Sequence, residues 1–158
     1  MTEQDKEFMR RAIELAQNGI EKGTGGPFGA VIVKDGKIVG EGCNQVTSTN
    51  DPTAHAEVVA IRNACKNLES FQLTDCTIYT SCEPCPMCLG AIYWARPAQI
   101  FFACTREDAA DVGFDDQFIY EEIELPIENR HIKSINFLRD EGLKVFQNWV
   151  KMTDKTKY

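Results

Sequence analysis

Apolar side chains recur along the chain with two different spacings. From Thr2 to about Gly19 they return with helical spacing, which predicts a first helix with one face against a core. Two strand-like runs, Ala30 to Val33 and Lys37 to Gly42, flank Asp35-Gly36, a dipeptide typical of tight β-hairpins. Because Ala30 to Val33 is apolar throughout, we expect it to be a central strand of a sheet.

Further elements follow in strand, helix, strand order. A helix is predicted to start near Asp51-Pro52-Thr53 and to continue to about Leu68. Thr77 to Thr80 then predicts a short strand, Pro86 to Arg96 a helix and Gln99 to Ala103 a buried strand. This order implies parallel strands joined by a right-handed crossover. The pattern predicts an α/β protein with three layers, α/β/α, around a mixed central sheet.

The last third of the chain has weaker patterns. Glu107 to Val112 is predicted to be a short acidic helix or turn, and His131 to Phe137 an edge strand. After Gly142 a helical stripe follows, made of Leu143, Phe146, Trp149, Val150 and Met152. We expect residues 1–158 to form a single domain.

Composition narrows the range of functions. With 43% hydrophobic and 26% charged residues, the chain is typical of a soluble globular protein. It has neither an apolar run long enough to span a membrane nor a signal peptide, and its odd number of cysteines, seven, favours a reducing cytoplasm. The net charge of −7, without clustered Lys and Arg, argues against a nucleic-acid partner and favours a small-molecule substrate.

One pair of motifs predicts chemistry. His55-Ala56-Glu57 and Pro84-Cys85-Pro86-Met87-Cys88 together read His-x-Glu and Pro-Cys-x-x-Cys, the signature of zinc-dependent nucleobase deaminases. Cys85 and Cys88 share one face of a helix, and His55 would be the third ligand of one zinc ion per chain. Three protein ligands leave one position open, as in catalytic zinc sites.

The predicted helix starts explain this spacing. A helix that begins at Pro86 has Cys85 as its cap and Cys88 in its first turn, where the positive helix end stabilises thiolates. Glu57 projects in another direction from His55 and suits a proton carrier better than a ligand. Two alternatives stay open: a closed structural zinc site completed by Cys82, and a redox Cys-x-x-Cys pair.

With these motifs, the chain resembles the cytidine-deaminase-like superfamily, and most closely its small bacterial guanine deaminases. The likeness extends from the run Gly25 to Val33 to the C-terminal Tyr158, and includes Asn44 and the stretch Gly113-Phe114-Asp115-Asp116. The resemblance implies that Phe28 lines the base pocket and that Asn44, Asp116 and Tyr158 contact the substrate. Trp94, near the end of its helix, is expected to hold the flat ring against Phe28.

The resemblance also implies a reaction and an assembly. The reaction is hydrolytic deamination of guanine to xanthine and ammonia, with Glu57 as the proton carrier. The assembly is a homodimer whose C-terminal segments, about residues 126–158, are exchanged so that Tyr158 closes the partner's pocket. The alternatives are a tRNA adenosine deaminase, a cytosine or cytidine deaminase and a non-catalytic zinc-stabilised interaction module. Whether Asp115 contacts the substrate as well as Asp116 stays open.

Overall fold

A computed structural model describes residues 1–158 as two units, Met1–Asp116 and Gln117–Tyr158. The first unit is built on a four-stranded sheet in the order β2-β1-β3-β4, with β1 at Gly29–Lys34, β2 at Lys37–Cys43, β3 at Thr77–Cys82 and β4 at Gln99–Cys104. β1 runs antiparallel to β2 and β3, whereas β3 and β4 are parallel. The mixed central sheet and the parallel pair are therefore confirmed.

The β1–β2 hairpin turns at the predicted dipeptide. Asp35 and Gly36 both have positive φ, 50° and 71°, as a type I′ turn requires. β1 is buried along its length except at Lys34, because β2 and β3 flank it and helices cover both of its faces. The prediction that it is a central strand is correct.

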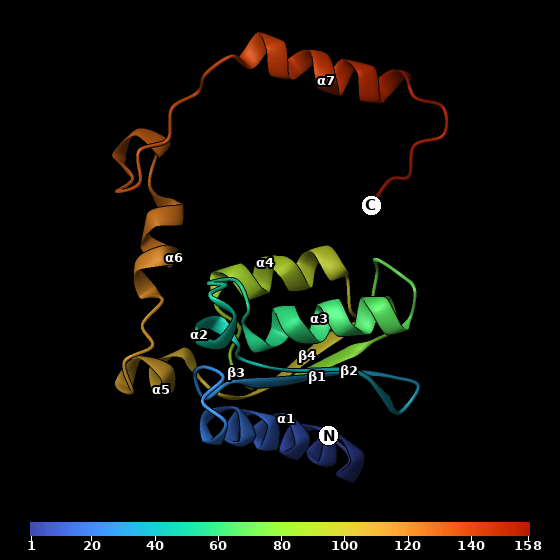
Figure 1. The fold of residues 1–158 in the computed structure, drawn as a ribbon, viewed down its shortest axis with the longest axis vertical. Helices are drawn as coiled ribbons and strands as arrows, with labels where there is room; N and C mark the ends of the chain where they lie inside the picture. The colour runs from blue at the N-terminus through green and yellow to red at the C-terminus, as the bar shows by residue number, and fades with distance from the viewer. The chain divides into compact units, whose positions relative to one another are not determined.

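Helices cover the two faces of the sheet, as Figure 1 shows: α1 (Glu3–Glu21) lies on one face, and α3 (Ala56–Asn67) and α4 (Pro86–Ala95) lie on the other. Alternate strand residues supply the two cores. Ile32 and Ile78 pack with the alanines of α3, whereas Val31 and Tyr79 pack against Phe8 of α1. The three-layer α/β/α architecture is confirmed.

Two local predictions differ from the structure. The predicted helix near Asp51 begins later, at Ala56, because the Asp51 side chain accepts hydrogen bonds from the backbone and hydroxyl of Thr53 and so stabilises a turn. A short helix, α2 (Val46–Thr49), lies between β2 and α3. The expected edge strand at residues 131–137 is wrong: the segment is irregular, since its apolar residues, Ile132, Ile135 and Phe137, do not keep a strict period of two.

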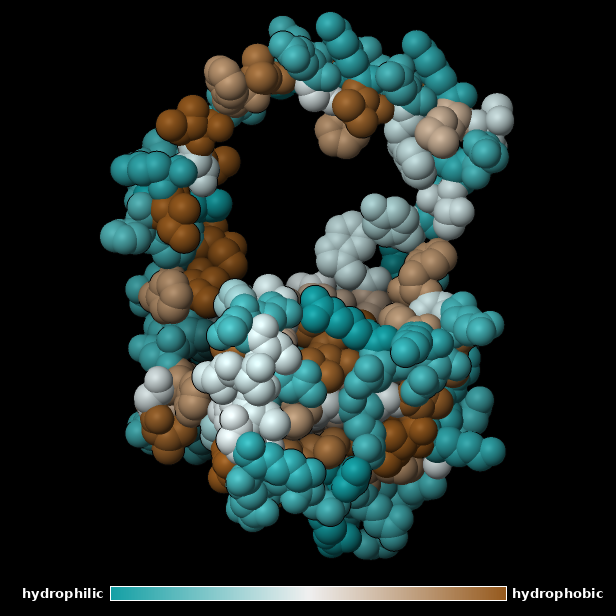
Figure 2. Space-filling view, viewed as in Figure 1, coloured by the Kyte–Doolittle hydropathy of each residue, from teal (hydrophilic) through white to brown (hydrophobic).

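The short helix α5 (Arg106–Asp111) belongs to the first unit, and the second unit contains α6 (Gln117–Glu124), the 3₁₀ turn η1 (Ile127–Asn129) and α7 (Arg139–Lys151). None of the second unit's helices contains a buried residue. Its exposed apolar side chains include Phe118, Ile123, Val145, Phe146 and Val150. Figure 2 shows brown, hydrophobic residues on this unit. No helix of the chain is both long and apolar enough to cross a membrane.

Candidate active site

The first half of the site is the start of α3. His55 is the N-cap residue of this helix, with extended backbone angles, and its backbone N–H donates to the carbonyl of Thr53 over 2.8 Å. Glu57 follows in the first turn and is only 6% exposed. The turn at Asp51-Pro52-Thr53 therefore delivers the imidazole and a buried carboxyl group to the same end of one helix.

The second half is the start of α4, as predicted. β3 ends at Cys82, and a short loop leads to Cys85, which is the N-cap residue, followed by Pro86 at the first helical positions. Proline suits this place because its missing N–H has no partner at a helix start and its φ is preset. Cys88 lies within the first turn and is fully buried.

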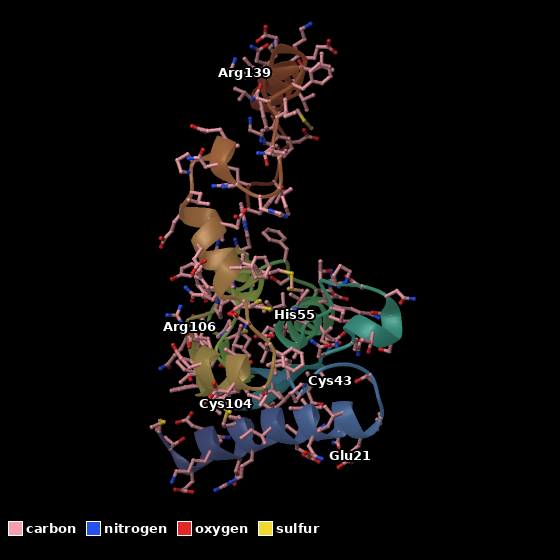
Figure 3. The ribbon with its side chains drawn as sticks, turned by 90° about the vertical axis from the view of Figure 1, so that its left-hand side faces the viewer. Glu21, Cys43, His55, Cys104, Arg106 and Arg139 are labelled. Carbon is pink, nitrogen blue, oxygen red and sulfur yellow. The ribbon has the colours of Figure 1, made fainter.

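The three predicted ligands converge. The Sγ atoms of Cys85 and Cys88 lie 3.6 Å and 3.5 Å from Nδ1 of His55, and all three ligand atoms lie within 4.8 Å of one another. Sulfur and nitrogen ligands bound to one tetrahedral zinc at ordinary bond lengths lie roughly 3.5 Å apart. The donor set and its spacing therefore fit zinc, and Figure 3 labels His55, the nitrogen ligand of the set.

The electrostatics also suit a metal cation. The hydrogen bond from Cys88, assisted by a second one with His55, lowers the pKa of Cys85 to about 4, so that this sulfur is a thiolate at neutral pH. The same hydrogen bond to Cys85 raises the pKa of Cys88, and burial raises it further. Without a metal, the Cys85 thiolate accepts a hydrogen bond from the Cys88 thiol. A bound cation would take the place of that proton and bind both sulfur atoms.

Glu57 lies beside the ligands without being one of them. The Sγ atom of Cys88 lies 3.4 Å from Oε2 of Glu57, and the cluster of possible ligand atoms consists of His55, Cys85 and Cys88. Burial raises the pKa of Glu57 above its usual value. A carboxyl group whose pKa moves toward neutrality can both take up and release protons during a reaction, which suits a general acid–base role.

A cavity of about 420 Å³ opens onto these groups. Its wall combines the zinc-site residues His55, Glu57 and Cys85 with residues of four segments. Those residues are Gly26, Phe28, Asn44, Val46, Thr47, Cys82, Glu83, Arg106, Ala109, Gly113, Phe114, Asp115 and Asp116. The cavity is large enough for a heterocyclic base and lies entirely within residues 1–116.

Three predicted substrate residues, Phe28, Asn44 and Asp116, line this cavity. Burial raises the pKa of Asp116. Phe28 meets the ring of Phe114 edge to face, with centroids 5.0 Å apart and an interplanar angle of 86°. The sequence pattern gave Phe114 no role, although its position next to Asp115 and Asp116 was a usable signal.

Trp94 and Tyr158 are not among the residues that line the cavity. Trp94 lies near the C-terminal end of α4 and is 65% exposed. Since Cys85 caps the opposite end, Trp94 is displaced roughly 13 Å along the helix axis. Tyr158 belongs to the second unit. The ring beside Phe28 in this cavity is thus Phe114, and contacts of Trp94 and Tyr158 with a substrate stay predictions.

Three further cavity residues were missed: Glu83, Arg106 and Thr47. The carboxylate of Glu83 accepts a hydrogen bond from the backbone N–H of Arg106 over 3.2 Å. This bond connects the loop between β3 and α4 to the start of α5, where Figure 3 labels Arg106. Nothing in the sequence pattern pairs these two residues, because the contact joins segments on either side of β4.

Comparison with known proteins agrees with this geometry. Residues 2–104 match the model of the cytidine and deoxycytidylate deaminase zinc-binding region. The chain is 59% identical to guanine deaminase of Bacillus subtilis over 151 residues, which are 96% of this chain and 97% of that protein. It is 40% identical to a tRNA-specific adenosine deaminase of Haemophilus influenzae over 121 residues, 73% of this chain and 69% of that one.

A solved structure extends the likeness. The crystal structure of Bacillus subtilis guanine deaminase matches with a TM-score of 0.95 and 58% identity, over 97% of this chain and 98% of that one. The cluster of His55, Cys85 and Cys88 on two helix starts and the matched region that contains it therefore lead to one conclusion. The chain belongs to the family of zinc-dependent cytidine and deoxycytidylate deaminases.

Proposed function

We propose that the protein catalyses the hydrolytic deamination of guanine to xanthine and ammonia. The observation that carries the proposal is the carboxylate of Asp116 in the same cavity as His55, Cys85 and Glu57. Guanine presents N–H donors at N1 and at its exocyclic amine, and a carboxylate accepts such donors. Adenine and cytosine lack a ring N–H at that edge. The likeness to guanine deaminase over nearly the whole chain supports the same substrate.

His55, Cys85 and Cys88 would hold the zinc ion. When bound there, zinc supplies Lewis-acid activation of water at neutral pH. The remaining chemistry belongs to the protein's own groups: Glu57 takes a proton from the water that attacks C2 of guanine, and passes it to the adjacent ring nitrogen. Glu57 then takes the second proton of that water and delivers it to the departing amine. Water and guanine thus give xanthine and ammonia.

The cavity walls orient the ring for this attack. Phe28 and Phe114 offer aromatic surface to a flat heterocycle, and Asp116 and Asn44 offer polar groups to its edges. A base held in this way presents C2 to the zinc-site end, where Glu57 lies. Positioning of this kind contributes to catalysis because the translational and rotational entropy of the base is already lost when it binds.

The test is ammonia release by the zinc-loaded protein from a panel of guanine, adenine, cytosine, cytidine and a tRNA anticodon hairpin. We expect guanine to be turned over far faster than the others. Asp116→Asn replaces an acceptor by a group that is partly a donor, and an unmet buried hydrogen bond predicts a tenfold loss or more on guanine. Equal turnover of cytosine or the hairpin would contradict the proposal in favour of the pyrimidine or tRNA alternative.

We further propose that the protein acts as a homodimer in which the C-terminal segments, about residues 126–158, are exchanged. Amphipathic α7 supports this, because its apolar residues Val145, Phe146 and Val150 are 68%, 69% and 71% exposed and its own unit offers no core to cover them. A second copy of the chain is the partner proposed, since an exchange of identical segments is a low-cost route to a dimer. Tyr158 of each chain would then close the pocket of the other.

Complementation in mixed dimers tests the exchange. One chain carries Glu57→Ala with an intact C-terminus, and the other keeps a sound zinc site but lacks residues 155–158. If the tails act in trans, a mixed dimer regains one working site from the second chain's zinc centre and the first chain's Tyr158. A mixed dimer that forms but does not deaminate guanine would end the proposal.

The seven cysteines are all free thiols in the structure, which supports a reducing compartment, and we propose the cytoplasm. Detection of the protein in a fractionated cell extract would test this.

A further inference from the structure

The side chain of Asn44 is held in one orientation. It follows β2, is 5% exposed, and its Oδ1 accepts hydrogen bonds from the backbone N–H groups of Gly26 and Val46, each over 3.2 Å. Both partners are donors, so only the carbonyl end of the amide can face them. The NH₂ end must therefore point the other way.

That other direction is the cavity. Asn44 is one of the residues that line it. Nδ2 has no hydrogen-bond partner in the protein, and the structure contains no fully buried side-chain nitrogen or oxygen without a partner. Nδ2 is consequently accessible from the cavity, where it presents two N–H donors and no acceptor.

Thr24 fixes the backbone of Asn44. Its Oγ1 lies 3.0 Å from the carbonyl oxygen of Asn44 and 3.1 Å from that of Gly19, and its one O–H proton is shared between these two acceptors. The carbonyl of Thr24 in turn accepts from the Ser48 backbone N–H over 3.2 Å and from the Thr47 hydroxyl over 3.1 Å. Thr24 thus connects the loop between α1 and β1 to the segment that begins with Asn44 by hydrogen bonds.

Gly25 leaves the space that the amide occupies. A Cβ atom at this position would collide with Oδ1 of Asn44 and would lie 2.7 Å from its backbone oxygen. The backbone of Gly25 does not have positive φ, so the requirement is one of space. Any side chain here would push the Asn44 amide out of its orientation.

We propose that Thr24 and Gly25 are positioning residues that make Asn44 a donor-only group toward an acceptor atom, O6 or N7, on the purine edge. The inference rests on the proposed function and deepens it. Asp116 is an acceptor and Asn44 a donor in the same cavity, so the two together select a ring that offers both kinds of group. Fixing the amide before the base arrives removes the cost of ordering it on binding.

The first experiment is a double-mutant cycle on the zinc-loaded protein. Thr24→Val removes the hydroxyl but keeps the shape, and we expect kcat/KM for guanine to fall roughly tenfold, the effect of one weakened buried hydrogen bond. Thr24→Ser should restore it. Thr49→Val is the matched control, because Thr49 is exposed and does not line the cavity, and its hydroxyl donates to the Gln45 carbonyl.

The cycle is completed in an Asn44→Asp background. Aspartate keeps the acceptor for the two backbone N–H groups but presents an oxygen to the cavity in place of NH₂. We expect a loss of roughly 10- to 100-fold in kcat/KM, as for an unmet buried hydrogen bond, and almost no additional loss from Thr24→Val. A Thr24→Val effect of equal size in both backgrounds would show a merely structural role and overturn the proposal.

Gly25→Ala gives an independent variant that deletes no hydrogen-bonding group. We expect unchanged zinc content and at least a tenfold lower kcat/KM, because the buried amide loses its orientation. Full activity of Gly25→Ala would contradict the inference. Analogues identify the acceptor: the Asn44→Asp loss should shrink on 7-deazaguanine if the acceptor is N7, and on 6-thioguanine if it is O6.

The positioning inference and the proposed function fail separately. If the wild type releases no ammonia from guanine, the proposed function is wrong, and the same cycle is then run with the base that the panel identifies. Coupling between Thr24 and Asn44 on that base would still support the inference, and its absence would overturn it.

Discussion

The zinc site and the C-terminal helix α7 differ in how their side chains are covered. Cys88 is fully buried and Glu57 is 6% exposed, whereas Phe146 is 69% and Val150 71% exposed. The site is assembled by two helix starts that pack on one sheet, so its groups find their partners within residues 1–116. A short amphipathic helix gains most of its stability from packing of its apolar face. The zinc-site side chains therefore have their partners within one chain, whereas the apolar face of α7 is left exposed.

The largest effect should come from the ligands themselves. Cys85→Ala or Cys88→Ala is expected to reduce bound zinc and deaminase activity to near zero, and to lower the melting temperature, because metal binding is linked to folding. Metal analysis and thermal unfolding measure both outcomes. Cys104→Ala, which removes an exposed cysteine outside the cluster, is the control and should keep its zinc. Zinc retained at full occupancy by both ligand variants would refute the assignment.

Glu57→Gln separates the chemistry from the metal. The amide has the size of the carboxyl group but cannot carry protons, so we expect normal zinc content and a loss of roughly 10²- to 10⁴-fold in kcat. Steady-state assays with metal analysis on the same sample check this. A near wild-type rate would rule out the proton-transfer role of Glu57 and leave the metal site untouched.

The proposed role of the exposed apolar face of α7 in a dimer contact can be tested at Trp149. Trp149 is 41% exposed in its own unit, and under the proposed exchange it becomes an anchor against the partner. Trp149→Ala should raise the dimer dissociation constant by roughly 30-fold, as for a buried aromatic interface residue. Sedimentation over a range of concentrations measures it, with Lys144→Ala as the control. Unchanged association would mean that α7 is not part of the dimer contact.

A small effect is expected far from both regions. Arg11 donates to both oxygens of Glu41, over 2.7 and 2.9 Å, and this lowers the pKa of Glu41 below its usual 4.5. The ion pair therefore stabilises the fold above about pH 4.5, and its contribution is lost as the pH falls through the lowered pKa. Both side chains are about one-third exposed, so the contribution is at most about 1 kcal/mol.

Urea unfolding of wild type and Glu41→Gln between pH 3 and pH 7 measures this contribution. The two should differ at neutral pH and converge in acid. Glu3→Gln breaks an exposed ion pair with Lys6 and should change little at any pH. A Glu41→Gln difference that grew in acid would contradict the sign of the shift.

The sequence predicted well those features of the fold that depend on a few residues adjacent in the chain. The start of α4 followed from Pro86 and the Cys85 cap, and the hairpin from Asp35-Gly36, because both depend on backbone preferences of a few positions. The start of α3 was placed too early because Asp51 has two ways to use its carboxylate, in a helix cap or in a turn, and it forms the turn with Thr53.

Contacts between distant segments were harder to predict. The edge-to-face pair of Phe28 and Phe114 joins two loops, and its geometry depends on how the glycines between α1 and β1 pack. Trp94 does not line the cavity because it lies near the end of α4 opposite to Cys85. Predicting this requires the position of each residue along the helix, which its aromatic character does not give. The family likeness identified Asn44, but only the structure shows which end of its amide faces the cavity.

The position of β4 at the edge of the sheet has a consequence for the folding of the newly synthesised chain. β4 is the last strand of the sheet, and its Phe102 is 47% exposed, so one row of backbone hydrogen-bonding groups beside apolar side chains lacks a neighbouring strand in this chain. Such an open edge accepts any extended segment, correct or not. The yield of native protein after synthesis or dilution from denaturant is therefore reduced by misassociation at this edge, and chaperones that shield β4 while the chain folds favour the native outcome.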